Sequence, residues 1–344
     1  MKIIDLFSGI GGFSLGFQKA GYQFTEHYFS EIDKHAIANY KHNFPHAKNL
    51  GDITTLHGRD FTDIDIITFG SPCQDFSLAG KREGLKGSKS SLIQHAIALI
   101  ADIRPSIFIW ENVKGAFSSN AGADFWAIIQ AFANIGGYRL EFQLLNTKWL
   151  LPQNRERIYL IGHLAGRSIP GVFPIGENDK LLKQETRKEN GEFPSIKTSP
   201  ARTITSRYHK MGSNDTYIIP KKAATLTGGG HSGGLHSDMT VIQINPSTES
   251  NGRQPYQQNR VFDVRGISPA LTRHNSNYAI SRMRRLTEIE CERLQGFPDN
   301  WTQYGDYNGT IKPIAKTQRY KLIGNAVTVD IVELIAKRLK FIEP

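Results

Sequence analysis

The chain has 344 residues, 22% of them charged, and a formal net charge of +10. It contains no apolar run of membrane-spanning length, and its first six residues lack the basic and then apolar layout of a signal peptide, so we expect a soluble, cytoplasmic protein with no membrane contact. Only two residues are cysteine, which argues against a disulfide framework and a zinc cluster, and we predict no metal site.

The first predicted element is a strand over Lys2–Leu6 that turns into a helix ending near Ala20. The turn, residues 5–12, reads Asp-Leu-Phe-Ser-Gly-Ile-Gly-Gly. Its glycines allow the backbone to approach a ligand closely, and the start of the helix offers free N–H groups. The third glycine of the dinucleotide fingerprint is absent, which favours a ligand without a pyrophosphate. Tight packing of the turn is the alternative explanation of the glycines.

The second predicted strand, Gln23–Phe29, is followed by two acidic residues with different roles. Glu31 stands roughly twenty residues after the first turn, where such folds bind ribose hydroxyls. Asp33 precedes a helical pattern that runs to Asn43, so Asp33 is the predicted N-cap of that helix. A further short strand, Asn49–Ile53, continues the alternation of strands and helices. This alternation predicts an α/β fold with a doubly wound, mostly parallel sheet.

A β-branched run, Ile64–Thr68, predicts a buried strand that leads into the segment Phe69–Ser77, Phe-Gly-Ser-Pro-Cys-Gln-Asp-Phe-Ser. Cys73 therefore follows the carboxyl end of a strand, where open α/β sheets hold their active sites. Cys73 is the candidate nucleophile, and a role as a small buried apolar residue is the alternative. The ten residues Gly80–Lys89 contain three glycines and four lysines or arginines, which predicts a mobile basic lid.

The next helical pattern, Leu92–Ile103, precedes a buried strand, Ile107–Trp110, that runs into Glu111. We expect Glu111 to lie on the strand next to the one before Cys73, at the same edge of the sheet. Beside the apolar Trp110, a carboxyl would have a raised pKa and would hold a proton to donate. The alternative is an acid that merely ends a strand at the surface.

An amphipathic helix, Asp124–Ile135, and a strand, Tyr138–Leu145, precede a loop that feeds another strand. In an extended segment Arg155 and Arg157 point to one side, and the glutamate between them points to the other. This arrangement suits two fixed hydrogen-bond donors that face a site better than it suits a random row of charges on the surface.

The composition changes after residue 166, and Gly171–Gly191 is predicted to be a linker or loop. Three segments with a weak repeat, 200–205, 223–227 and 269–272, predict short strands joined by polar loops. The stretch Phe193–Arg285 has 13 basic and 4 acidic residues, an excess that favours a surface in contact with phosphate. A solvated basic face and a chance repeat are the alternatives.

The C-terminal part begins with a helix that Arg284–Thr287 opens and that runs to Leu294. Cys291 lies on this helix and is assigned to inert packing. Residues 323–327, Ile-Gly-Asn-Ala-Val, lead into a closing amphipathic helix that ends near Leu339. The length of the chain allows one large core and a second, smaller domain.

Six short blocks of the sequence resemble blocks of the DNA (cytosine-5) methyltransferases and stand in the same order as in that family. The resemblance covers nearly the whole chain outside residues 165–280. Any one block is a weak signal, whereas six in one order are specific. The resemblance implies a Rossmann-like methyltransferase fold. It also implies methyl transfer from S-adenosyl-L-methionine, with S-adenosyl-L-homocysteine as product, to carbon 5 of a cytosine flipped out of double-stranded DNA. The blocks are 5–12, Pro72-Cys73-Gln74, Glu111-Asn112-Val113, Gln153–Arg157, Arg293–Pro298 and Gly324–Val327.

The resemblance also implies roles for individual residues. Cys73 attacks carbon 6 of the cytosine and Glu111 protonates N3. Arg157 contacts the carbonyl oxygen, with Arg155 in the same catalytic block. The residues implied for the cofactor are Asp5, Phe7, Ser8, Gly9, Gly11, Gly12, Glu31, Ile32, Asp52, Ile53, Pro72, Asn325 and Val327, with Phe7 stacked on adenine. The residues implied for the DNA are Gln74, Ser77, Arg82, Thr205, Thr227 and Arg273.

Under this resemblance residues 1–164 form a catalytic domain that binds S-adenosylmethionine. Residues 165–283 form a smaller, loop-rich, β-containing target recognition domain, and residues 284–344 return to the catalytic domain. Ser71 and Asp75 stand at positions that vary in the family and receive no role. We expect a monomer, and a restriction-modification system would add a cognate restriction endonuclease acting on the same site.

Three other functions compete with this prediction. One is a methyltransferase of the same build that acts on cytosine in transfer RNA, against which the long basic insert favours duplex DNA. Another is a DNA-binding regulator without catalysis, which the intact Cys73, Glu111 and Arg157 oppose. The third is a nicotinamide-dependent oxidoreductase, which the missing third glycine disfavours.

Overall fold

The computed structural model describes residues 1–71, 91–117, 122–176 and 286–342, together with six short strands between residues 201 and 285. The chain divides into two compact units, Met1–Asn214 with Thr287–Pro344, and Asp215–Leu286. The larger unit contains the main sheet and every helix that the structure describes.

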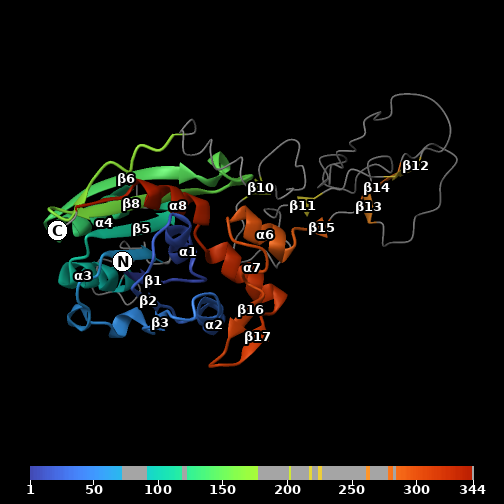
Figure 1. Ribbon diagram of the computed structural model, residues 1–344. Coiled ribbons are helices and arrows are strands. Elements are labelled where there is room, and N and C mark those ends of the chain that lie inside the picture. The colour runs from blue at the N-terminus through green and yellow to red at the C-terminus, as the bar shows by residue number, and fades with distance from the viewer. Residues whose placement is uncertain are drawn as a thin grey trace. The chain divides into compact units, whose positions relative to one another are not determined.

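The larger unit is built on a seven-stranded sheet with the strand order β3-β2-β1-β4-β5-β8-β6 (Figure 1). Neighbouring strands are parallel from β3 to β5, whereas β8 is antiparallel to both β5 and β6. The predicted α/β fold with a mostly parallel sheet is therefore confirmed. The strands are β1 (Lys2–Leu6), β2 (Glu26–Ser30), β3 (Lys48–Asn49), β4 (Ile66–Gly70), β5 (Ile107–Val113), β6 (Tyr138–Asn146) and β8 (Glu156–Leu164).

Apolar cores lie on both faces of the sheet because successive residues of each strand point to opposite sides. Ile66 of β4 and Ile109 of β5 belong to the core that α1 and α8 cover. Their neighbours Ile67 and Phe108 belong to a second core, under α3 and α4. The sheet is thus doubly wound. These four helices are α1 (Gly12–Lys19), α3 (Ser91–Ile103), α4 (Ala123–Asn134) and α8 (Val329–Arg338).

A third apolar cluster joins the N-terminal half of the chain to its C-terminal segment. Tyr40 stacks on Phe29 with ring centroids 4.0 Å apart, and Phe297 and Leu322 belong to the same cluster. Segments near opposite ends of the sequence therefore share one core. The helices of this region are α2 (Lys34–Asn43), α6 (Glu288–Leu294) and α7 (Lys316–Asn325).

Small strand pairings complete the described structure. In the larger unit β7 (Gln153–Asn154) pairs with β10 (Ala201–Arg202), β9 (Ser168–Ile169) with β18 (Lys340–Phe341), and β16 (Tyr304–Asp306) with β17 (Ile311–Pro313). In the smaller unit β11 (Tyr217–Ile218) pairs with β15 (Arg284–Arg285), and β14 (Tyr278–Ser281) lies between β12 (Ala224–Leu226) and β13 (Val261–Asp263). Among the described helices none has the length and apolar character needed to cross a membrane.

The largest error in the predicted elements concerns the strand expected over Asn49–Ile53. Strand β3 ends at Asn49, because Gly51 takes up a left-handed conformation with φ 77°. Asp52 then caps a turn of 3-10 helix and accepts a hydrogen bond from the N–H of Thr54 at 2.9 Å. Two other strands are displaced by a few residues: β2 begins at Glu26 and β4 extends to Gly70.

The first residues of the predicted linker or loop, 171–176, form a loop packed onto the larger unit. Val172 and Ile175 are buried. Their N–H groups donate to the side chains of Glu141 at 3.0 Å and Gln143 at 2.7 Å on β6. A free linker is therefore excluded for these residues, and the rest of Gly171–Gly191 lies outside the described residues.

A buried carboxylate ties α6 to α7 and to the loop that follows α6. Glu292 is fully buried and accepts hydrogen bonds from the N–H groups of Asn300 and Thr302, both at 2.8 Å. Arg319 of α7 donates to the same carboxylate at 3.0 Å. A buried charge requires such partners, because its desolvation is otherwise costly.

Replacing Arg319 by Met should lower the free energy of unfolding by about 3 to 5 kcal/mol, because the Glu292 charge would stay buried without its cation. The matched control is Arg293→Met, which removes a pair with Asp299 at 2.6 Å in which both side chains are at least one-third exposed. Exposed pairs contribute about 1 kcal/mol or less. Urea unfolding of both variants measures the difference, and equal losses would contradict the role given to Glu292.

Candidate active site

The turn between β1 and α1 has an unusual backbone. Phe7 has φ 50° and Gly11 has φ 82°, and positive φ at a residue other than glycine often marks a functional site. A Cβ atom on Gly11 would lie 2.4 Å from the Phe44 ring, so only glycine fits there. The Ser8 hydroxyl is buried and has no hydrogen-bond partner within the described part of the chain. A Cβ atom on Gly9, in contrast, would meet no atom within 4 Å. The turn therefore presents both open space and an unused polar group to a ligand.

The two acidic residues after β2 have the separate positions that the sequence predicts. The carboxylate of Glu31 accepts the N–H of Gly9 at 2.9 Å and those of Ile32 and Asp33 at 2.8 and 2.9 Å. Asp33 instead caps α2 and accepts the N–H of His35 at 2.8 Å. Glu31 is thereby fixed against the glycine turn, and a carboxylate retains capacity for a further hydrogen bond after accepting three.

The block at residues 324–327 also packs against the glycine turn. A Cβ atom on Gly12 would lie 2.7 Å from Cγ2 and 3.2 Å from the carbonyl oxygen of Val327, so only glycine fits against this segment. Asn325 is exposed. Ile32 follows β2, the strand next to β1, with 74% of its surface exposed, and such an apolar side chain is suited to cover a flat ligand. The carboxylate of Asp52 accepts from the Thr54 N–H and lies after β3, the strand next to β2.

Arg155 and Arg157 have different partners. The guanidinium of Arg155 is buried and donates to the carbonyl oxygen of Ala326 at 2.7 Å and to that of Gly324 at 3.4 Å. Arg155 thus holds the segment on either side of Asn325. Arg157 instead reaches Glu111, with Nε 3.0 Å from Oε1.

Glu111 lies where β5 meets both β4 and β8. Its Cα pairs with Gly70 of β4, and 8% of its surface is exposed. Burial raises the pKa of this carboxyl, while the charges of Arg157 and Arg155 lower it by less. The raised pKa agrees in direction with the prediction that Glu111 holds a proton.

Two hydrogen-bonded contacts near the site were not predicted from the sequence. The hydroxyl of Ser71 accepts hydrogen bonds from the indole Nε1 of Trp110 at 3.0 Å and from Nδ2 of Asn112 at 3.1 Å. The indole of Trp301 donates to the carbonyl oxygen of Ile10, within the glycine turn, at 3.0 Å. Neither pairing has a sequence signal, because the partners are far apart in the chain.

Ile53, predicted to bind the cofactor, is buried in the apolar core under α3 and α4. The other predicted site residues lie outside the described residues. The structure neither supports nor opposes their roles. They are Pro72, Cys73, Gln74, Ser77 and Arg82 around the predicted nucleophile, with the lid Gly80–Lys89, and Thr205, Thr227 and Arg273 in the basic segment. Within ranges 1–71, 91–117, 122–176 and 286–342, no three His, Cys, Asp or Glu side chains gather as a metal ion would require.

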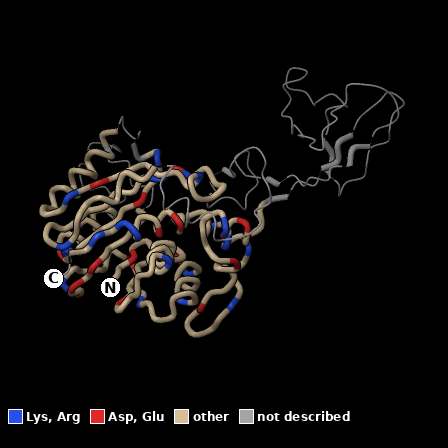
Figure 2. The backbone as a smooth tube through the Cα atoms, turned by 45° about the horizontal axis from the view of Figure 1, so that its top comes forward, with Lys and Arg blue, Asp and Glu red and all other residues tan. Residues whose placement is uncertain are grey.

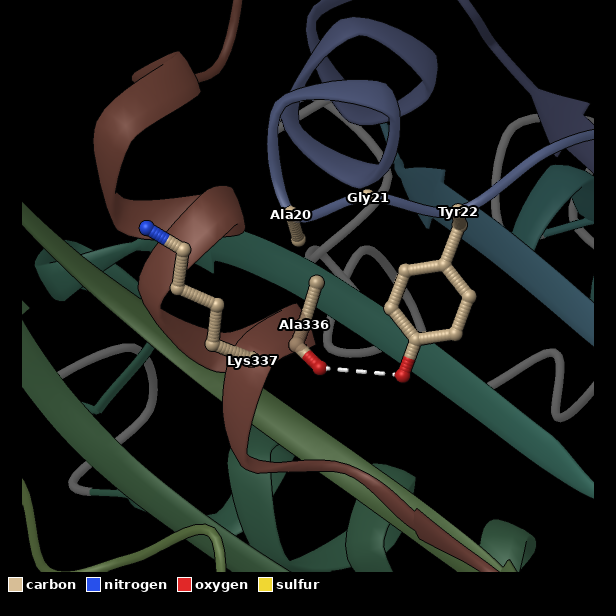
Figure 3. A pocket seen from close by; sticks show the side chains of 5 residues that line it. All are labelled: Ala20, Gly21, Tyr22, Ala336 and Lys337. Atoms are coloured by element: carbon tan, nitrogen blue, oxygen red, sulfur yellow. Dashed lines mark hydrogen bonds between the residues drawn. The ribbon is translucent and has the colours of Figure 1, made fainter.

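A pocket of about 210 Å³ lies between the end of α1 and α8 (Figure 3). Ala20, Gly21 and Tyr22 line one side, Ala336 and Lys337 line the other, and the Tyr22 hydroxyl donates to the Ala336 carbonyl at 3.1 Å. Helix α1 begins at the glycine turn and ends before this pocket. The pocket is therefore separate from the candidate site.

Asp5 lies beneath the glycine turn and is fully buried. One carboxyl oxygen is 3.0 Å from the hydroxyl of Thr68, and the other lies 3.3 Å from Tyr40 and 3.4 Å from Ser14. None of these partners carries a positive charge. Burial therefore raises the pKa of Asp5 to about 8, with a smaller contribution from the charge of Glu31.

Nearly the whole chain is similar to proteins of one known family. The family described as C-5 cytosine-specific DNA methylase matches residues 1–341. The orphan methyltransferase M.SPRI of Bacillus phage SPR is 26% identical over 98% of this chain and 97% of its own. The type II methyltransferase M.NgoBI of Neisseria gonorrhoeae is 30% identical over 100% of this chain and 94% of its own. The crystal structure of S. pombe Dnmt2 methyltransferase, 19% identical, has the same fold, with a TM-score of 0.61 over 97% of this chain and 96% of that one.

Asp5→Asn should remove part of the pH dependence of stability. The carboxyl keeps its proton in the folded protein up to about pH 8, whereas its ordinary pKa is 3.8, so the folded state binds one extra proton between these values. This stabilisation is complete below about pH 4 and is lost as the pH rises through about 8. Urea unfolding across this range should show the wild type losing stability relative to Asp5→Asn. Parallel profiles of the two proteins would contradict the assignment.

Proposed function

The chain belongs to the C-5 cytosine-specific DNA methylases, and from this premise we propose how its residues carry out the reaction. As a DNA cytosine-5-methyltransferase it methylates carbon 5 of cytosine in DNA. We propose S-adenosylmethionine as the methyl donor and Cys73 as the nucleophile. The observation that carries the proposal is the pairing of Gly70 with Glu111, because Cys73 follows three residues after Gly70 and its loop therefore starts beside the acid.

The residues around the glycine turn fit S-adenosylmethionine. The Ser8 hydroxyl is buried without a partner within the described segments, and the carboxylate of Glu31 is held against Gly9, where it suits ribose hydroxyls. Asp5, Phe7, Gly11, Gly12, Ile32, Asp52, Ile53, Pro72, Asn325 and Val327 complete the proposed set. When bound, the cofactor supplies the methyl group.

The thiolate of Cys73 adds to carbon 6 of the cytosine, and Glu111 donates a proton to N3, so that carbon 5 becomes nucleophilic. Arg157 donates to the carbonyl oxygen of the base, and Arg155 holds the segment of Asn325. After carbon 5 is methylated, a base removes its hydrogen, the thiolate leaves, the double bond between carbons 5 and 6 is restored, and N3 returns its proton to Glu111. The raised pKa of Glu111 supports its role as the proton donor.

Cytosine carbon 5 is not reachable inside a stacked duplex, so the base must be flipped out. We propose that Gln74, Ser77 and Arg82, with the lid Gly80–Lys89, close the pocket around it. Residues 165–283, which carry Thr205, Thr227 and Arg273, form the proposed target recognition domain, and 1–164 with 284–344 form the catalytic domain. The compact smaller unit, Asp215–Leu286, covers only the later part of this proposed recognition domain. The excess of basic residues in 193–285 supports this, since acidic and basic residues are interspersed along the described larger unit (Figure 2).

The names of the relatives support two biological settings. The type II methyltransferase M.NgoBI favours a restriction-modification system with a cognate endonuclease. The orphan methyltransferase M.SPRI of a phage favours an enzyme without one. We propose the first setting, between which and an orphan enzyme the sequence alone does not decide, with a monomeric enzyme that acts on double-stranded DNA in the cytoplasm.

Glu31→Ala should weaken binding of S-adenosylmethionine, because each hydrogen bond to a charged group contributes about 1.5 to 3 kcal/mol. The matched control is Asp33→Ala, which removes the cap of α2 and should lower stability by about 1 kcal/mol while leaving cofactor affinity close to that of the wild type. Calorimetric titration with S-adenosylmethionine measures both. Unchanged affinity in Glu31→Ala would remove this residue from the site.

DNA that carries 5-fluorocytosine at the target should trap a covalent protein–DNA complex. Fluorine at carbon 5 cannot be removed as a proton, so the thiolate of Cys73 cannot leave. The complex should require S-adenosylmethionine, survive a denaturing gel and map to the peptide that contains Cys73. Cys73→Ser should abolish the complex, because a serine hydroxyl is far less ionised than a thiol near neutral pH.

The control for this trap is Cys291→Ala. Cys291 is buried in α6, and burial raises the pKa of its thiol, so this variant should still form the complex. A complex that maps to Cys291, or one that persists in Cys73→Ser, would overturn the proposed nucleophile.

A further inference from the structure

Hydrogen bonds to the side chain of Ser71 hold the first residue after β4 in place. Ser71 follows the last residue of β4 and is 6% exposed. Its hydroxyl oxygen accepts two hydrogen bonds, from Trp110 Nε1 at 3.0 Å and from Asn112 Nδ2 at 3.1 Å. A serine oxygen has two lone pairs, so both are used. Asn112 also donates to the Ser71 carbonyl, at 3.3 Å.

Both donors are themselves fixed. Trp110 is fully buried and stacks on Phe125 with ring centroids 6.5 Å apart. Asn112 uses its Oδ1 to accept the N–H of Val113 at 2.7 Å, which turns its Nδ2 toward Ser71. Trp110 and Asn112 stand on either side of Glu111 in β5. The hydroxyl of Ser71 is therefore bound to the two residues that flank the proposed acid.

Only two peptide bonds separate Ser71 from the predicted nucleophile. Pro72 has a ring that restricts its own φ and also limits the backbone of Ser71. Cys73 is two residues from Ser71, so its Cα lies at most about 7 Å away. The segment between Ser71 and Cys73 is therefore too short to absorb a shift at Ser71.

We propose that Ser71 is a positioning residue, whose hydroxyl fixes the start of the Cys73 loop relative to Glu111 and so sets the place of the thiol. This inference rests on the proposed function of Cys73. An error of about 1 Å in the placement of a reacting group costs up to about a hundredfold in rate. The rival explanation is that the hydroxyl only contributes to the stability of the core.

A buried serine on β9, elsewhere in the larger unit, separates these explanations. Ser168 is 2% exposed, donates to the carbonyl of Ser106 at 3.0 Å and lies 3.2 Å from Nδ1 of His163. Ser106 directly precedes β5, whereas Glu111 is near the other end of that strand. Ser168→Ala therefore removes a similar set of buried hydrogen bonds far from the candidate site.

The experiment compares Ser71→Ala with Ser168→Ala in a Cys291→Ala background, in which Cys73 is the only thiol of the full chain. Two quantities are measured for each variant: steady-state methylation of DNA, and the rate of alkylation of Cys73 by iodoacetamide without DNA or cofactor. For Ser71→Ala we expect kcat to fall about tenfold or more, KM for S-adenosylmethionine to stay within about twofold, and alkylation to become at least about threefold faster. Ser168→Ala should change none of these beyond about twofold.

Trp110→Phe provides a second variant, because it removes the indole N–H and keeps an aromatic ring. It should change kcat and alkylation in the same directions as Ser71→Ala, and the double variant should lose less than the product of the two single losses. The proposal is overturned if Ser71→Ala behaves like Ser168→Ala, or if the losses multiply. If the wild-type protein formed no covalent complex with DNA that carries 5-fluorocytosine, the proposed function would be refuted instead. The alkylation rates would still show whether Ser71 holds the loop.

Discussion

The register between β4 and β5 is the constraint on which the candidate site depends. It pairs Gly70 with Glu111, and a slip of one residue would turn every side chain of one strand to the other face. Close packing on both faces opposes this slip, because the paired residues Phe69 and Trp110 fill one core and the paired residues Ile66 and Ile107 fill the other. Gly70 also leaves room for the acid, since a Cβ there would lie 3.1 Å from Oε2 of Glu111. The burial and the raised pKa of Glu111 follow from this pairing.

Buried polar contacts join the blocks that the sequence keeps far apart. Gln153 donates to the carbonyl of Leu294 at 2.7 Å, and Arg155 donates to the carbonyl of Ala326. The hydroxyls of Thr147 and Thr328 lie 2.8 Å apart. Such groups are costly to leave without partners in a core. The late blocks of the chain are therefore parts of one assembly with the middle of the sheet, and a change in one of them strains the others.

Much of this arrangement was predictable from local patterns. The periodicities of two and 3.6 residues located most strands and helices, and the cap at Asp33 and the position of Glu111 follow from neighbouring residues alone. The partners of Ser71, Arg155 and Trp301 were not predictable, because each depends on which distant segments the fold brings together. Local conformation also produced errors: the left-handed Gly51 ended a strand that the composition alone would extend.

The pairing of β11 with β15 brings together the two ends of the smaller unit, with Tyr217 opposite Arg285 and Ile218 opposite Arg284. The chain between them therefore starts and ends at one pair of strands, and doubling the length of a segment whose ends are joined costs only about 0.6 kcal/mol in closure entropy. Residues can thus be added to or removed from this interval during evolution without changing where the chain leaves and re-enters the flanking sequence. Recombination at these two strands would exchange the whole interval as a cassette, and an old catalytic framework could acquire a new insert in one genetic event.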